Sequence, residues 1–160
     1  MKKFNTMMAM MLALVSMCVA FSSCSSDDDN DTAGGAKEIA GSYTSTLETT
    51  VMGKASTFDN LTMKIEAVDD ATVKVTLPAC DKGMMPLPAL EVPAVKVSGS
   101  NGAYAFSQES YAGTVTVDGE EKKYTVTLQG TFKDNTLTVN YQLQYGKMPV
   151  EMICKFVCNK

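Results

Sequence analysis

The sequence predicts an all-β protein: a single antiparallel up-and-down β-barrel of about eight to nine strands, preceded by a signal peptide and a disordered acidic tether. Three observations predict this fold. From Gly41 onward apolar and polar residues alternate, which is the period of a strand with one buried face. Turn-forming pairs such as Asn101-Gly102 and Asp118-Gly119 separate the alternating stretches. No stretch after Lys37 has a sustained helical period.

The composition narrows the function. A chain of 160 residues is about one domain's worth of sequence. It carries a net charge of -4 and contains neither His nor Arg, so nucleic acid is not an expected partner. Without His, the usual base near neutral pH and the commonest metal ligand are missing. The composition therefore indicates a protein that is not an enzyme and has no cofactor and no metal. It gives no indication of the oligomeric state.

Residues 1–23 have the pattern of an export signal. Lys2 and Lys3 precede a largely apolar run from Met7 to Ala20, and small residues lead up to Cys24. The run is shorter than the roughly 20 residues that a membrane-spanning helix needs, which disfavours a transmembrane segment. The end of the pattern resembles the lipobox of bacterial lipoproteins, so Cys24 is predicted to be lipidated and to anchor the chain to a membrane. Cys18 is a poorer candidate because the bulky Met17 precedes it.

Residues 24–38 are predicted to be a lipidated, flexible tether. They include the acidic run from Asp27 to Asp31 and almost nothing apolar to bury. A weak calcium site in this run is a less favoured alternative. Acidic residues just after a lipidated cysteine resemble the signal with which Gram-negative gut anaerobes export lipoproteins to the cell surface. We therefore expect an outer-membrane location that faces the cell surface, with a periplasm-facing anchor as the alternative.

The alternation of apolar and polar residues predicts the strands themselves. They are expected at residues 42–51, 57–67, 72–77, 90–97, 103–107, 111–117, 124–132, 137–145 and 148–157. Consecutive hairpins favour a barrel over a two-sheet sandwich, since a sandwich of the Greek-key type needs long crossovers. Closure also removes the exposed edges that Val- and Thr-rich strands would otherwise present.

Four segments carry a resemblance to a known family. Residues 39–44, 87–97, 104–107 and 126–132 resemble the calycin-like β-barrel domain found in lipoproteins of gut anaerobes. Gly41-Ser42-Tyr43 also stands where lipocalins have Gly-x-Trp, with Tyr43 in place of the Trp. The resemblance implies a lipocalin-like barrel over residues 39–158, and it implies no settled activity or ligand.

The inward rows of such a barrel supply the candidate binding residues. An eight-stranded barrel either fills with its own side chains or holds one small ligand. Small residues in the apolar rows, such as Gly113 and Gly130, leave both outcomes open. The irregular segment around Met84 and Met85 is interpreted either as a plug or as a binding lip. The candidate ligand-binding residues are Tyr43, Leu47, Met63, Ile65, Met84, Met85, Leu128, Tyr141, Met152 and Phe156.

Three cysteines remain in the predicted mature protein, where an oxidising envelope allows a disulfide to persist. Cys154 and Cys158 are not expected to pair with each other if they share one strand, because four residues separate their Cα atoms by about 13 Å. A bridge from Cys80 to either Cys154 or Cys158 remains as a hypothesis. Three dispersed cysteines make a poor zinc site, and an acid–base pair among Glu48, Glu66 and Glu91 has no support.

Two functions fit these observations. The first is a membrane-anchored, non-enzymatic module that binds a small apolar ligand in or at the mouth of the barrel. The second is a surface interaction or inhibitor domain that has a packed core and binds a protein partner through its loops. The free volume inside the barrel distinguishes the two, because ordinary ligand pockets measure a few hundred cubic ångströms.

Overall fold

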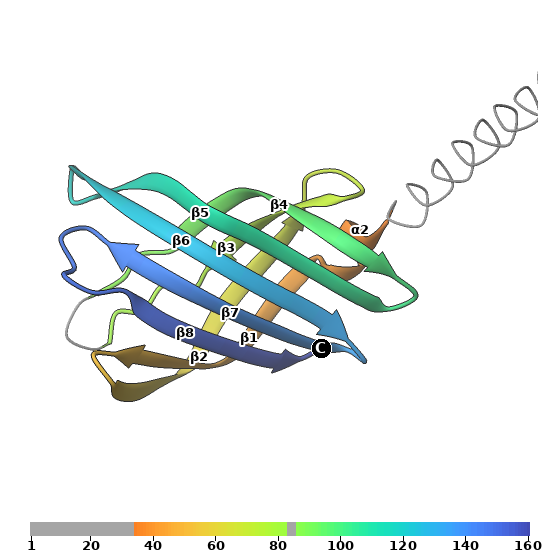
Figure 1. Ribbon diagram of the computed structural model, residues 1–160, viewed down its shortest axis with the longest axis horizontal. Helices are drawn as coiled ribbons and strands as arrows, with labels where there is room; N and C mark the ends of the chain where they lie inside the picture. Colours follow the sequence, from red (N-terminus) through yellow and green to blue (C-terminus); the bar gives the residue numbers. More distant parts are fainter. Residues whose placement is uncertain (1–33, 83–85) are drawn as a thin grey trace, which may run out of the picture.

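The computed structural model describes residues 34–82 and 86–160, and these form one closed antiparallel barrel (Figure 1). Each strand pairs with the next one along the chain, and the first pairs with the last. The predicted up-and-down barrel is thereby confirmed, with eight strands. The strands are β1 (Gly41–Val51), β2 (Lys54–Ala67), β3 (Thr72–Leu77), β4 (Leu90–Ser100), β5 (Ala103–Val117), β6 (Glu120–Lys133), β7 (Thr136–Tyr145) and β8 (Met152–Asn159).

The ring closes between β1 and β8. Leu47 lies opposite Phe156, and Thr49 lies opposite Cys154. The hydroxyl of Ser45 adds a hydrogen bond to the carbonyl of Val157, 2.5 Å away. Closure pairs the strand edges that an open sheet would leave exposed.

Two-residue turns join several of the strands. Asn101-Gly102 and Asp118-Gly119 have positive φ at both positions, as hairpin turns of this kind require. Met52-Gly53 makes the same turn between β1 and β2, with φ values of 50° and 77°. Methionine is not a preferred residue of such turns, so the sequence predicts this turn less clearly than the Asn-Gly and Asp-Gly turns.

One strand is longer than the sequence indicated. Residues 103–107 and 111–117, expected as two strands, belong to the single strand β5. The pairing with β6 shifts register between Gln108 and Tyr111, and Ser110 has a φ of 45°. This bulge interrupts the alternation of apolar and polar residues without ending the strand. The sequence pattern therefore predicted two strands where there is one.

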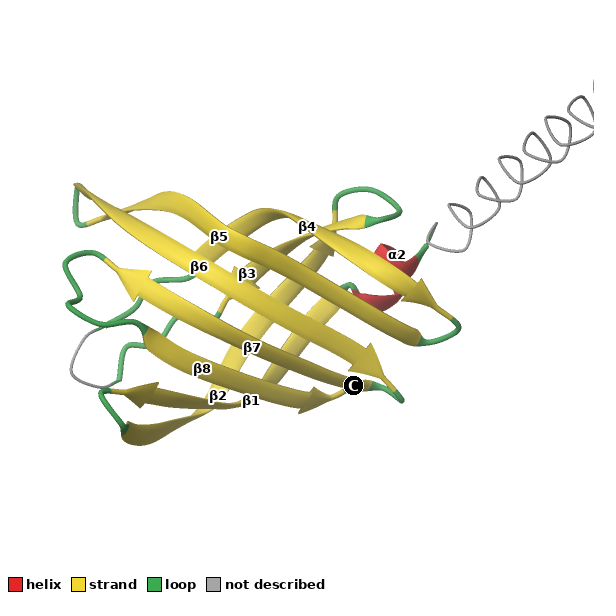
Figure 2. Cartoon of the chain, viewed as in Figure 1, coloured by secondary structure: helices red, strands yellow, loops and turns green. Residues whose placement is uncertain are grey.

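A short helix, α2 (Gly35–Ile39), covers one end of the barrel (Figure 2). Residues 35–38 were expected to belong to the flexible tether, and that prediction was wrong. Ala36 and Ile39 are fully buried, so the segment does contain apolar surface that the barrel can cover. Gly35 lies against the ring of Tyr104, where a larger side chain would not fit.

We call this end of the barrel the helix end. The β2–β3, β4–β5 and β6–β7 turns and the C-terminus lie at this end, and the other four strand connections form the opposite, loop end (Figure 1). No helix among the described residues is long and apolar enough to span a membrane. The predicted signal peptide, the lipidation site Cys24 and most of the tether lie outside the described residues, and these remain predictions.

Tyr43 holds the helix end together. Its hydroxyl donates a buried hydrogen bond of 2.6 Å to the carbonyl of Ile39. The ammonium group of Lys160 lies over the rings of Tyr43 and Phe132, 5.9 Å and 5.7 Å from their centroids. The same ammonium group donates to the carbonyls of Glu38 and Ala40. Lys160 therefore connects the C-terminus to the segment around α2 at the helix end.

Replacing Tyr43 by phenylalanine should lower the free energy of unfolding by about 1–2 kcal/mol. The ring and its contacts remain, but the buried carbonyl of Ile39 loses its donor. Urea denaturation of the purified domain measures the change. An unchanged midpoint would show that the hydrogen bond contributes nothing to stability.

Candidate functional site

The interior of the barrel is filled by its own side chains. Of the ten candidate ligand-binding residues, eight lie in the described part of the chain, and all eight point inward. Their exposed fractions range from 0% for Met63 and Phe156 to 7% for Met152. A void large enough for a water molecule would leave exposed area on the atoms that line it, so Met63 and Phe156, at 0%, line no such void. The eight residues are Tyr43, Leu47, Met63, Ile65, Leu128, Tyr141, Met152 and Phe156.

The other two candidates, Met84 and Met85, lie outside the described residues, so the choice between plug and binding lip remains open. The segment that contains them is fastened at its base by an isolated pair of backbone hydrogen bonds. Cys80 and Leu87 bond to each other in both directions, at 2.8 Å and 2.7 Å. Cys80 is buried and Leu87 packs partly against the core.

Two polar side chains lie side by side in the apolar interior near the loop end. Tyr141 on β7 lies opposite Cys154 on β8, and both are buried. Burial raises the pKa of Tyr141 well above its ordinary value, and Cys154 and Cys80 add to that effect. Burial also raises the pKa of the Cys154 thiol to about 12, although the hydrogen bond with Tyr141 opposes the shift. Tyr141 and Cys154 are therefore neutral at physiological pH, so neither of them supplies a nucleophile.

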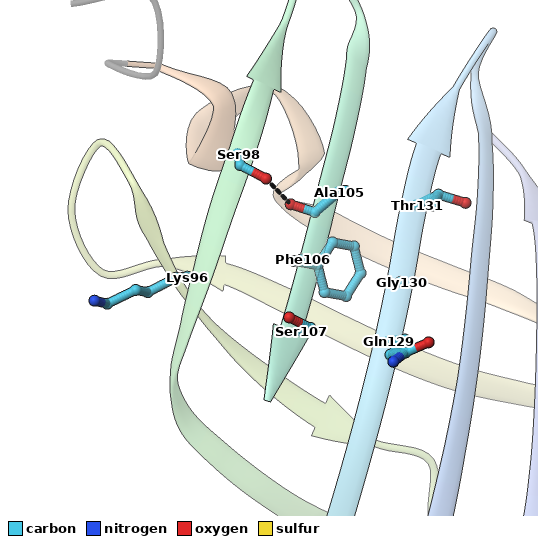
Figure 3. A pocket seen from close by; sticks show the side chains of 8 residues that line it. All are labelled: Lys96, Ser98, Ala105, Phe106, Ser107, Gln129, Gly130 and Thr131. Atoms are coloured by element: carbon cyan, nitrogen blue, oxygen red, sulfur yellow. Dashed lines mark hydrogen bonds between the residues drawn. The ribbon is translucent and has the colours of Figure 1, made fainter. Parts of the chain in front are cut away.

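Two hollows lie on the outer wall of the barrel. One, of about 360 Å³, crosses β4, β5 and β6 (Figure 3). The ring of Phe106 and the backbone of Gly130 form its floor, and short polar side chains surround it. The other lies over β5 and β6 beside Gly113 and Tyr124. Both hollows are shallow and open, and each lies at a glycine that the sequence placed among the inward residues.

An ionic network covers the outer face of β2, β3 and β4. Glu66 accepts hydrogen bonds from Lys64 at 2.8 Å and from Lys74 at 2.7 Å, and Lys74 also lies 3.5 Å from Glu91. The bonds from Lys64 and Lys74 lower the pKa of Glu66 to about 2. Glu66 is thus ionised at any physiological pH, which argues against its use as a general acid.

The network predicts a small dependence of stability on pH. The pKa of Glu66 falls from 4.5 in the unfolded chain to about 2 in the folded one, so its contribution is complete above pH 4.5 and disappears as the pH falls toward 2. The midpoint difference between the wild type and Glu66→Gln should therefore be largest above pH 5 and shrink toward pH 2. Thermal melts at intervals between pH 2 and pH 7 would measure it. A difference that grows on acidification would contradict this assignment.

Within residues 34–82 and 86–160, no three His, Cys, Asp or Glu side chains lie close enough together to hold a metal ion. The eight described candidates face inward as expected, but sequence reasoning missed the two outer hollows. Those hollows depend on which residues become neighbours across strands, such as Phe106 on β5 and Gly130 on β6. The alternation within a single strand contains no such information.

The meander topology, the closure of β1 on β8 and the apolar interior define a small antiparallel barrel of the lipocalin-like class. The comparison with family models makes this specific. Residues 39–159 match the calycin-like β-barrel domain, and the chain belongs to that family. The family resemblance expected from the sequence is confirmed.

A solved structure has the same fold. It is a crystal structure of a Bacteroides fragilis protein that carries a provisional outer-membrane designation. The two chains superpose with a TM-score of 0.64 and are 21% identical, over 80% of this chain and 53% of the other. This chain thus spans about half the length of that neighbour. No curated protein matches the sequence.

Proposed function

We propose that the chain is a lipid-anchored interaction module of the outer membrane that binds a protein partner with its loop end. The observation that carries this proposal is the filled interior. Met63, Val126, Val139 and Phe156 are 0% exposed, which leaves no space beside them for an apolar ligand. Of the two functions that fit the sequence, the packed-core interaction domain agrees better with this geometry.

The position of α2 favours the loop end as the binding surface. The chain enters the barrel through α2. An anchor on Cys24 would therefore hold the helix end near the membrane and leave the loop end facing away from it. The loop end presents the side chain of Met52, which is 78% exposed. A flexible thioether of this kind adapts well to an apolar pocket on a partner. The calycin-like barrel is generally a binding fold, and the structural neighbour carries an outer-membrane designation.

Site-specific photo-crosslinking in intact cells tests the proposal. A photoreactive amino acid replaces Met52 in one strain and Val68 in another. Both are exposed apolar residues, at 78% and 60%, and they lie beyond the two ends of β2. We expect a discrete crosslinked protein from position 52 and none from position 68. Crosslinking at position 68 alone, or at neither position, would contradict the assignment of the loop end.

Two further measurements complete the test. Native mass spectrometry of protein purified from its own host should show no retained lipid-like adduct. A stoichiometric apolar adduct would contradict the interaction module and favour the ligand-binding module instead. Protease treatment of intact cells should cleave the domain if the anchor is on the cell surface. A domain protected until the outer membrane is opened would indicate the periplasm-facing orientation.

A further inference from the structure

We propose that Cys80 and Cys154 form a structural disulfide that joins the base of the β3–β4 connection to β8, and that Cys158 remains a thiol. The inference is independent of the partner proposed above. It rests on the positions of the three cysteines along the barrel.

The register of β8 separates two of the cysteines. β8 starts at the loop end, where Cys154 is its third residue, and it finishes at the helix end, where Cys158 is its seventh. Four residues of strand place the two Cα atoms about 13 Å apart, against a limit near 7 Å for a disulfide. Cys80 follows β3, whose last residue, Leu77, also lies at the loop end. Topology therefore brings Cys80 to the same end as Cys154.

The Cys80 side chain is buried at the loop end. It is 3% exposed, and the paired hydrogen bonds with Leu87 hold its backbone in place. Its Sγ atom lies 3.1 Å from the carbonyl oxygen of Lys82. The Cys154 side chain is 1% exposed and is directed inward, beside Tyr141. The contribution of Cys80 to the raised pKa values of both Tyr141 and Cys154 supports a position near them.

Cys158 belongs to different surroundings. Its Sγ lies 3.4 Å from the carbonyl oxygen of Thr44 and 3.4 Å from that of Asn159. It also lies opposite Leu137, at the start of β7 and hence at the helix end. No step of the chain's topology brings Cys158 toward Cys80.

The oxidation needs a partner that accepts two electrons. A disulfide of an envelope thiol–disulfide oxidoreductase, or oxidised glutathione, fits this role. One cysteine thiolate attacks the oxidant's disulfide and forms a mixed disulfide, releasing one oxidant thiol. The second cysteine then displaces the other oxidant sulfur, so that two cysteine protons and two electrons pass to the oxidant. Burial raises the pKa of Cys154, so thiolate is scarce in the closed barrel, and we expect the bridge to form while the chain is folding.

Peptide mapping tests the pairing. The full chain is exported in a Gram-negative host, and free thiols are blocked with N-ethylmaleimide in denaturant. Trypsin then cleaves after lysine, so that the three cysteines lie in separate peptides, 75–82, 148–155 and 156–160. We expect 75–82 linked to 148–155, and 156–160 carrying the label. Labels on all three cysteines, or any link that includes 156–160, would overturn the proposal.

Variants provide the controls. Cys158→Ser should keep the link, and Cys154→Ser should leave Cys80 labelled. Adding a reductant should lower the denaturation midpoint of the wild type and of Cys158→Ser, but not that of Cys80→Ser. The map of the wild-type chain identifies the pairing by itself, so the test does not depend on the folding of any variant. An equal effect of reductant on Cys80→Ser and the wild type would overturn the proposal.

Discussion

Replacing Gly130 by valine is expected to destabilise the barrel by about 3 kcal/mol, at the upper end of the usual cost of overpacking a core. A Cβ atom at this position would overlap the ring of Phe106 on the neighbouring strand. Even the third nearest ring atom, Cε1, would lie only 2.7 Å away. Phe106 is 3% exposed, so a shift of its ring also requires its packed neighbours to move. Urea denaturation measures the loss.

A double-mutant cycle identifies the cause. Phe106→Ala alone should also destabilise, because it leaves a cavity beside Gly130. If the ring causes the overlap, the double variant should be more stable than the sum of the two single effects by about 1–2 kcal/mol. Thr131→Val serves as the matched control, because its side chain is exposed on the outer wall one residue along. Strict additivity would show that Gly130 is needed for another reason.

Replacing Phe156 by alanine should cost about 3–5 kcal/mol, the largest effect that we expect from truncating one side chain. Phe156 is 0% exposed and lies on β8 opposite Leu47 and Val139, at the point where the ring closes. Its removal leaves a cavity that the surrounding strands fill only in part. Val157→Ala is the matched control, since that side chain is 40% exposed on the outer wall and its truncation should change stability little.

The same variant tests the filled interior directly. Benzene at saturating concentration should raise the melting temperature of Phe156→Ala by occupying the new cavity, because a ligand that binds only the folded state stabilises it. It should leave the wild type unchanged. A comparable increase in the wild type would show that the native barrel contains an apolar space, and it would favour the ligand-binding function over the interaction module.

The fold was largely predictable because the alternation of apolar and polar residues can be recognised within each strand separately. In β7, Leu137, Val139 and Tyr141 alternate with polar residues, and all three are buried as expected. The turn at Asp118-Gly119 was predictable from the two residues alone. By contrast, α2 escaped prediction because five residues with Ala36 and Ile39 as their apolar members are too short for a helical period.

The candidate site was less predictable for a physical reason. Alternation identifies which residues face inward, but a filled barrel and a hollow one have the same inward rows. Whether Phe106 fills the space over Gly130 depends on the register between β5 and β6, and on how rings from several strands fit together. The pairing of Cys80 likewise depends on which end of the barrel each cysteine occupies, which became known only from the topology.

The pairing of β1 with β8 also determines when the domain is able to fold. Residues 47–50 find their partners only at residues 153–156, more than a hundred positions later. A chain still emerging from the ribosome lacks its last strand and cannot close the ring. Contacts so distant in sequence form slowly. The closed barrel therefore forms only after the final strand has been synthesised, because β1 has no other partner on that edge.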